Sequence, residues 1–191
     1  MTLDSHVKIS SGRSFRGAIK SISDGPHYVI QLRNIECEGD EYHINTDDII
    51  KTEIKTNRKI AFLSDGDILV SSKGSTFRAY ILKNIPQNTV CTQHFFLLTP
   101  DKKILPEFIT AIINLPVNQR WLHQRSSGSY QTMLTLATLS KMPFPEMSLV
   151  QQQQFIELCK QVKEEKTIMK QMVENTEKQL ASLVSEYTHD E

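Results

Sequence analysis

The chain has 191 residues and a mass of 21.9 kDa, with 39% hydrophobic and 23% charged residues, a composition typical of a soluble globular protein. Lysine and arginine number 22, as do aspartate and glutamate, so the net charge is zero and a protein that binds nucleic acid through bulk positive charge is excluded. Three cysteines without paired spacing exclude a disulfide framework and a CxxC zinc site.

The distribution of charge and hydropathy narrows the class further. Residues 1–148 carry 17 basic and 14 acidic side chains, whereas residues 149–191 carry five and eight, so any contact with an anionic partner is expected in the front part. The first 17 residues are polar, and no run approaches the ~18 apolar residues that a membrane span needs. We expect a cytoplasmic protein with no membrane partner.

Short β-like runs alternate with turns in the first two thirds of the chain. They lie at residues 27–32, 66–72, 79–82 and 94–98, and Asp-Gly, Lys-Gly and Pro signals bound them. The pattern predicts the strands of a mixed sheet.

Two helices are expected within or beside this sheet. Residues 106–122 begin with Pro106, and Phe108, Ile112 and Leu115 share a face, which predicts one docked helix. Residues 131–142 predict a second, shorter helix, although threonine is a weak helix former. Its shared face carries Met133, Leu136, Ala137 and Ser140.

A single long helix is predicted from residue 148 to residue 187. The segment contains neither glycine nor proline, and Ser148 is placed to cap its start. The overall expectation is therefore an α+β fold: a globular domain at residues 1–147, the helix at 148–187 and a tail at 188–191.

The apolar residues of this helix follow a seven-residue repeat, which is typical of a coiled-coil seam. About 40 helical residues extend ~60 Å, which is longer than a domain of this size is wide, so we expect a partner helix outside the front domain. The alternative is a helix folded back over the sheet. Lys166 and Thr176 interrupt the seam. The expected dimerisation residues are Phe155, Cys159, Val162, Met169, Val173, Leu180, Leu183 and Tyr187.

Motifs for catalysis or metal binding are weak. The seven glycines form neither a phosphate-binding loop nor a dinucleotide-binding turn, and the six histidines form no metal-binding pair. Glu53 and Lys55 behind Asp47 and Asp48 resemble the acids and lysine of a nuclease, but a charged loop explains them better. Cys91 and His94 are close enough in sequence to suggest a nucleophile and its base. We do not expect them to act together, because residues i and i+3 on a strand point to opposite faces. We therefore expect no catalytic residue and no bound metal.

Three polar, basic segments occupy expected loops, at residues 11–17, 71–80 and 124–132. Each combines Arg or Lys with small hydroxyl residues and a glycine, which lets a backbone approach phosphate while long side chains contact phosphates or base edges. Each segment taken alone is also typical of a solvated loop. The three together predict a DNA-binding face. Its expected members are Arg13, Arg16, Lys73, Ser75, Thr76, Arg78, Arg125, Ser129 and Tyr130.

The order of five segments along the chain carries a family resemblance. They are the Gly-Asp strand at 63–74, the strand at 92–98, the Leu-Pro-Glu helix start at 104–114, the Gly-Ser loop at 126–134 and the proline-rich entry to a Gln-rich helix at 142–156. In this order they resemble the DNA-specificity subunit of type I restriction-modification systems. The resemblance covers nearly the whole chain.

The resemblance implies a target recognition domain that reads one half of a split DNA site, followed by a spacer helix. Such subunits usually contain two domain-plus-helix units whose helices pair antiparallel, and this sequence resembles one unit, either a half-length subunit or one cut to a single half. Pairing of two copies would restore this geometry, so the resemblance implies an antiparallel homodimer. The implied partners are double-stranded DNA, the modification subunit and the restriction subunit. S-adenosylmethionine and ATP are expected on those other subunits, with no cofactor in this chain.

Two other functions are compatible with the sequence. One is a scaffold whose long helix recruits a partner while the front domain does not read DNA. The other is a nuclease or hydrolase that uses Asp47, Glu53 and Lys55, or Cys91 and His94.

Overall fold

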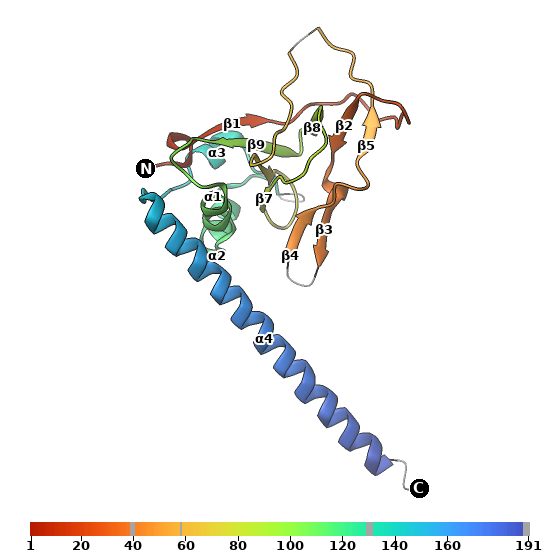
Figure 1. Cartoon of the computed structure of the whole chain (residues 1–191), viewed down its shortest axis with the longest axis vertical. Coiled ribbons are helices and arrows are strands. Elements are labelled where there is room, and N and C mark those ends of the chain that lie inside the picture. The colour runs from red at the N-terminus through yellow and green to blue at the C-terminus, as the bar shows by residue number, and fades with distance from the viewer. Residues whose placement is uncertain (39–40, 58, 129–131, 189–191) are drawn as a thin grey trace.

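The computed structural model describes residues 1–38, 41–57, 59–128 and 132–188. A front part of short strands and short helices is followed by one long helix that projects away from it (Figure 1). The expected α+β class is therefore confirmed. No helix among the described residues has the length and apolarity needed to cross a bilayer.

The main sheet has four antiparallel strands in the order β1-β9-β6-β7. Their bounds are β1 Val7–Ser11, β6 Ile68–Ser71, β7 Ala79–Ile81 and β9 Phe95–Pro100. Every residue of β6 is buried, because alternate side chains enter two different apolar clusters on the two faces of the sheet. Ile68 and Val70 pack with the helices, and Leu69 packs toward the second sheet.

The second sheet is smaller and mixed, in the order β5-β2-β8, with β2 parallel to β8 and antiparallel to β5. Its strands are β2 His27–Ile30, β5 Ile50–Thr52 and β8 Thr89–Cys91. A hairpin of β3 Ile35–Glu38 and β4 Glu41–Ile44 extends from this sheet, beside the first part of the long helix (Figure 1). Two 3-10 helices, Leu3–Ser5 and Leu32–Asn34, complete the front part.

The helix expected over residues 106–122 is two helices, α1 Pro106–Asn114 and α2 Pro116–Arg125. The single-helix prediction is wrong because Pro116 lacks an N–H and restricts the residue before it, and Leu115 adopts an extended ψ of 137°. Phe108 and Ile112 are buried in the cluster under the main sheet, as expected. α1 thus covers one face of that sheet.

The second expected helix is shorter than the sequence pattern predicts. α3 spans Leu136–Ser140, and the Thr135 hydroxyl caps it by accepting from the Thr138 N–H. Met133, expected on the helix, instead lies in an extended segment that forms bridges with Lys73 and Ser127. The backbone pairing of Met133 therefore overrides the helical spacing.

The long helix α4 spans Leu149–Thr188. Ser148 and Gln151 form a reciprocal cap, in which the Ser148 N–H donates to Gln151 Oε1 at 2.9 Å and the Gln151 N–H donates to Ser148 Oγ at 3.4 Å. The first turns contact the front part, where Phe155 packs edge-on against Phe108 with ring centroids 5.4 Å apart. Beyond these turns the helix projects, so the folded-back alternative is wrong (Figure 1).

Candidate nucleic-acid interface

The three basic segments meet at one end of the main sheet. Strand β1 ends at Ser11 and β6 ends at Ser71, while β9 starts at Phe95, and antiparallel pairing places all three at the same end. β7, which starts at Ala79, joins them there. The loops that leave these strand ends therefore lie side by side.

A continuous series of backbone contacts joins the first two segments through the turn at residues 92–94. Arg13 bridges Thr92, and its N–H donates to the Cys91 carbonyl at 2.8 Å. At the other side of the turn, the Ser72 N–H donates to the His94 carbonyl at 2.8 Å. The turn thus fixes the distance between the segment at 11–17 and the segment at 71–80.

The third segment joins the second by the same kind of contact. The Leu134 N–H donates to the Ser72 carbonyl at 2.9 Å, and Lys73 bridges Met133. Met133 and Ser127 exchange two backbone hydrogen bonds of 3.2 and 2.8 Å. We call residues 11–17, 71–76 and 124–128 of these three segments the loop face.

Two glycines of the loop face are required by local geometry. A Cβ on Gly12 would lie 2.1 Å from the Thr92 carbonyl oxygen, so only glycine lets the first segment approach the turn. Gly74 has a φ of +119°, which other residues rarely adopt. Both glycines hold the backbone of the loop face in its shape.

The cationic side chains of the loop face are accessible. Arg16 and Arg125 are exposed, and Arg13 and Lys73 are half-buried. Two arginines lie over aromatic rings: Arg13 Cζ is 6.0 Å from the centroid of Phe15, and Arg125 Cζ is 4.4 Å from that of Trp121. Stacking occupies the face of a guanidinium and leaves the N–H groups at its edge able to donate to phosphate or base.

The hydroxyl residues of the second segment lie at its tip. Ser75 and Thr76 are exposed, and the backbone carbonyl of Thr76 accepts a 3.0 Å hydrogen bond from Ser71 Oγ. Ser129 and Tyr130, also expected on this face, lie outside the described residues.

The Arg78 side chain lies in a groove beside α4. Its Cζ is 4.2 Å from the ring centroid of Tyr42 on the hairpin, and both residues line a groove between the front part and α4. The Nε of Arg78 is buried and lacks a hydrogen-bond partner among the described residues. Sequence reasoning did not separate Arg78 from the loop face, because the hairpin that it contacts is distant in sequence.

Two amide side chains missed in the sequence analysis hold the backbone around Arg78. Gln119 binds both backbone groups of Phe77, and Asn114 binds both backbone groups of Ala79. They are separated from these partners by 42 and 35 residues, so no local signal identifies them.

His94 lies in the turn that joins the first two segments of the loop face. Its burial and, as a smaller effect, the positive charge of Lys73 lower the pKa of the imidazole. His94 is therefore favoured in its neutral form, and Lys73 is the nearby cation.

The residues of the hydrolase alternatives do not form a catalytic arrangement. Burial raises the pKa of the Cys91 thiol to about 12, which opposes formation of a nucleophilic thiolate. Lys55 Nζ lies 3.5 Å from Glu53 Oε2 at the surface, and no three His, Cys, Asp or Glu side chains in the described ranges could hold a metal together.

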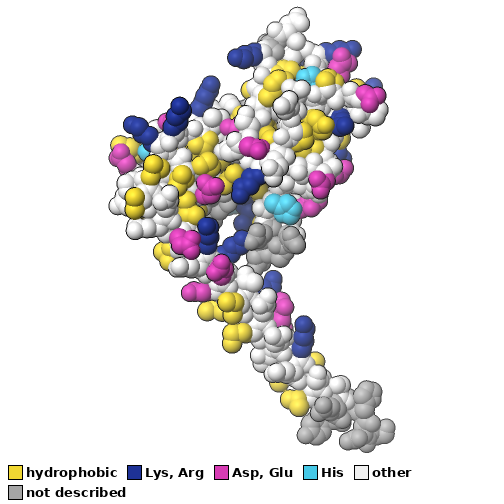
Figure 2. All heavy atoms as spheres, viewed as in Figure 1, with side chains coloured by type: hydrophobic (Ala, Val, Ile, Leu, Met, Phe, Trp, Pro, Cys, Tyr) yellow, Lys and Arg dark blue, Asp and Glu magenta, His cyan; other side chains and the backbone are white. Residues whose placement is uncertain are grey.

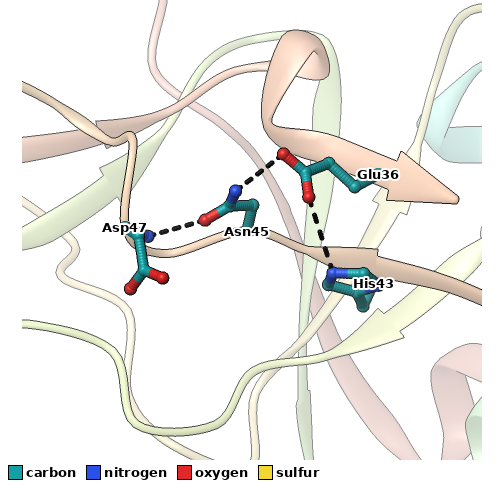
Figure 3. Close-up of polar contacts among 4 residues, drawn as sticks. All are labelled: Glu36, His43, Asn45 and Asp47. Atoms are coloured by element: carbon teal, nitrogen blue, oxygen red, sulfur yellow. Dashed lines mark hydrogen bonds and ion pairs between the residues drawn. The ribbon is translucent and has the colours of Figure 1, made fainter. Parts of the chain in front are cut away.

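Asp47 belongs instead to a polar network that stabilises the hairpin (Figure 3). Asn45 Oδ1 accepts from the Asp47 N–H at 2.7 Å, and Asn45 Nδ2 donates to Glu36 Oε1 at 2.6 Å. The other oxygen of Glu36 lies 3.8 Å from His43 Nε2. This network fixes the loop that follows β4 against β3.

The predicted seam of α4 is accessible beyond its first turns. Val162, Met169, Val173, Leu180 and Leu183 have relative exposures between 41% and 63%. Phe155 and Cys159 are half-buried near the front part, and nothing is described of the Tyr187 side chain. The helix therefore presents an apolar stripe that its own chain leaves uncovered from Val162 to Leu183.

The chain was compared with protein families and with curated proteins. A family model described as the type I restriction modification DNA specificity domain matches residues 6–177. No curated protein matches the chain.

Two solved structures share the fold. The S subunit of a type I restriction-modification system from M. genitalium has 14% sequence identity and a TM-score of 0.52, with 86% of this chain and 38% of that chain covered. A chain from a type I R-M system, solved for its complex assembly and conformational transition, has 14% identity and a TM-score of 0.62, with 95% and 42% covered. The chain thus spans about two fifths of the length of the structures it matches.

Proposed function

Because the chain belongs to the family of type I restriction modification DNA specificity domains, we propose that it is a non-catalytic subunit that binds double-stranded DNA sequence-specifically and reads one half of a bipartite site. The observation that carries this proposal is the loop face, in which three basic segments are joined by backbone hydrogen bonds at one end of a sheet. A rigid backbone with Arg and Lys side chains at its edge suits contacts to phosphates and to the major-groove edges of bases.

Within the loop face, the proposed DNA contacts are the four cations Arg13, Arg16, Lys73 and Arg125, together with Ser75 and Thr76. Ser129 and Tyr130 stay proposed contacts on the basis of the sequence of the third segment, and they lie outside the described residues. Arg78 is assigned to the groove instead, because it stacks on Tyr42 there. Each lost phosphate contact lowers the slope of log affinity against log salt by about 0.9, whereas a lost base contact costs about 1 to 3 kcal/mol at one base pair.

The experiment is a titration of duplex DNA with the chain in complex with the modification subunit, at several salt concentrations. Alanine at all four cations should weaken binding and lower the salt slope. Alanine at Lys8, Lys55, Lys102 and Lys141, four lysines outside the loop face, is the matched control and should leave the slope unchanged. Equal slopes for both variants would contradict the proposed face, and no binding by the unmutated complex would favour the scaffold function.

The partners proposed beyond DNA are the modification and restriction subunits. In this proposal, S-adenosylmethionine and ATP bind to those subunits and this chain supplies no catalytic residue. A cytoplasmic location is consistent with such a complex.

We further propose that α4 pairs with α4 of a second copy in an antiparallel homodimer. The support is the apolar stripe from Val162 to Leu183, which lies on one side of the projecting helix. A two-fold dimer would present two copies of the loop face, and its DNA site would be two inverted half-sites around an unread spacer.

A further inference from the structure

A groove of about 1310 Å³ lies between the front part and the first half of α4. One wall is α4 from Phe155 to Lys170, and the opposite wall includes Tyr42, Arg78 and Leu115. Figure 2 shows Lys and Arg side chains around a hollow between the front part and the helix.

The seam of α4 faces into this groove. Phe155, Cys159, Val162 and Lys166 are seam positions, and all four line the groove. A helix that pairs along the seam therefore has to enter the groove at this end. In an antiparallel pair, the segment that reaches this end is the C-terminal part of the other α4.

The volume of the groove fits a helix end. A helix with its side chains is about 10 to 12 Å wide and rises 1.5 Å per residue, so 1310 Å³ corresponds to a cylinder about 12 to 17 Å long, or about 8 to 11 helical residues. The seam positions in the groove span a similar length, from Phe155 to Lys166.

The chemistry of the groove also fits this occupant. Its described lining combines apolar side chains, such as Leu158 and Val162, with the cations Arg78, Lys163 and Lys166. Residues 171–188 of α4 are complementary, because they carry the apolar stripe together with three glutamates and one lysine. If duplex DNA occupied the groove, its charged phosphates would lie against the apolar side chains of the groove, which is unfavourable. A helix with an apolar stripe is therefore the better occupant.

Resting on the proposed homodimer, we infer that the groove receives the C-terminal part of α4 from the second copy, in one defined register. Met169 pairs with the second copy's Val173 at the centre of this register. Moving outward along the seam, the further layers pair Lys166 with Thr176, Val162 with Leu180, and Cys159 with Leu183.

The two polar seam positions select this register. Lys166 and Thr176 share a layer, so the remaining described layers are apolar. A shift of one heptad in one direction places Lys166 against Leu183, and a shift in the other direction places it against Met169. Each shifted register buries a lysine against an apolar side chain, which is unfavourable.

Charge at the edge of the seam supports the same register. Glu177 of the second copy follows Thr176 and lies beside Lys163 and Lys166, and the two-fold axis repeats this contact. Lys170 lies near the two-fold axis, next to Lys170 of the second copy, and the two like charges oppose pairing. Glu174, one turn along each helix, lies on the same side and counteracts this repulsion.

Disulfide trapping in the full chain tests the register. The background carries Cys37→Ser and Cys159→Ala, while the buried Cys91 is retained. The double variant Val162→Cys, Leu180→Cys should form a covalent dimer under oxidising conditions, and each single variant should form much less of this dimer. Residues 162 and 173 face each other only after a shift of one heptad, so the double variant Val162→Cys, Val173→Cys should form no covalent dimer.

Light scattering on the same samples separates the two proposals. A dimer that is trapped by the shifted pair and not by the first pair overturns the register and leaves the homodimer standing. A mass of 21.9 kDa at every concentration overturns both. The charge swap is an independent variant: Lys163→Glu should weaken the dimer at least about tenfold, and adding Glu177→Lys should restore it. No restoration contradicts the register.

Alkylation of the chain with all its natural cysteines tests separately whether the second helix occupies the groove. Cys159 lies in the groove, and Cys37 is exposed and serves as an internal reference. Alkylation of Cys159 relative to Cys37 should be at least about tenfold slower in the dimer than in a monomeric variant. Equal rates would show that the second helix does not enter the groove.

Discussion

The side-chain amide of Gln119 hydrogen-bonds both backbone groups of Phe77: its Oε1 accepts from the Phe77 N–H at 3.0 Å and its Nε2 donates to the Phe77 carbonyl at 3.0 Å. Asn114 makes the same pair of contacts with Ala79, each at 2.9 Å. The two amides take the place of a neighbouring strand at the edge of the main sheet. They fix the backbone on both sides of Arg78.

We therefore predict that Gln119→Ala lowers the free energy of unfolding by about 1 to 3 kcal/mol, because it leaves buried backbone groups of Phe77 without partners. Urea denaturation of the full chain measures this change. Gln124→Ala, at an exposed position on the same helix, should change it by less than about 0.5 kcal/mol. Similar values for the two variants would contradict the proposed role of Gln119.

Gln152 is predicted to fix the start of α4 on the front part. Its buried amide accepts from the Leu105 N–H at 2.9 Å and donates to the carbonyls of Met147 and Lys103 at 2.9 and 3.3 Å. Gln152→Ala should lower the free energy of unfolding by about 1 to 3 kcal/mol and widen the distribution of distances between spin labels on α4 and the front part. Gln153→Ala is the matched control because Gln153 is exposed. A distance distribution unchanged by Gln152→Ala would count against this role.

Glutamate at both Val173 and Leu180 should abolish the proposed dimer and leave the front part folded. Both side chains are more than half exposed on α4, so no core contact is lost, whereas pairing would bury four added charges in the dimer. Light scattering and far-ultraviolet circular dichroism measure the two effects. The control variant carries Gln171→Glu and Ser182→Glu, which add the same charge outside the seam. A dimer that survives in the first variant would contradict pairing along this seam.

Cys91 should resist alkylation in the folded protein at pH 8. Burial raises the pKa of its thiol to about 12, so the thiolate is a very minor species at this pH. Mass spectrometry after treatment with iodoacetamide should find Cys37 modified and Cys91 unmodified until denaturant is added. Rapid modification of Cys91 in the native state would reopen the nucleophile alternative.

The local parts of this structure could be predicted from the sequence. Ser148 with Gln151 is a capping-box pattern, and the unbroken segment after it forms the helix that the pattern predicts. The break before Pro116 follows from a general property of proline that the helical spacing of Phe108 and Ile112 concealed. β5 and β8 have three residues each, too few to show a period, and were not among the predicted strands.

The long-range parts could not be predicted in the same way. The loop face depends on the contact of Arg13 with Thr92 and of Lys73 with Met133, and both require the register of strands that are distant in sequence. The separation of Arg78 from the other cations depends on Tyr42 in a hairpin that the sequence pattern did not show. Composition indicated which loops are basic, and the register determined which of them meet.

Sequence reading by this chain is tested most directly by selecting bound duplexes from a random pool with the full chain in complex with the modification subunit. We expect enrichment of two inverted copies of one short half-site at a fixed spacing, and loss of this enrichment when Arg13, Arg16, Lys73 and Arg125 are all alanine. Sequencing that finds no enriched motif, while the complex still binds DNA, would contradict sequence reading by this chain.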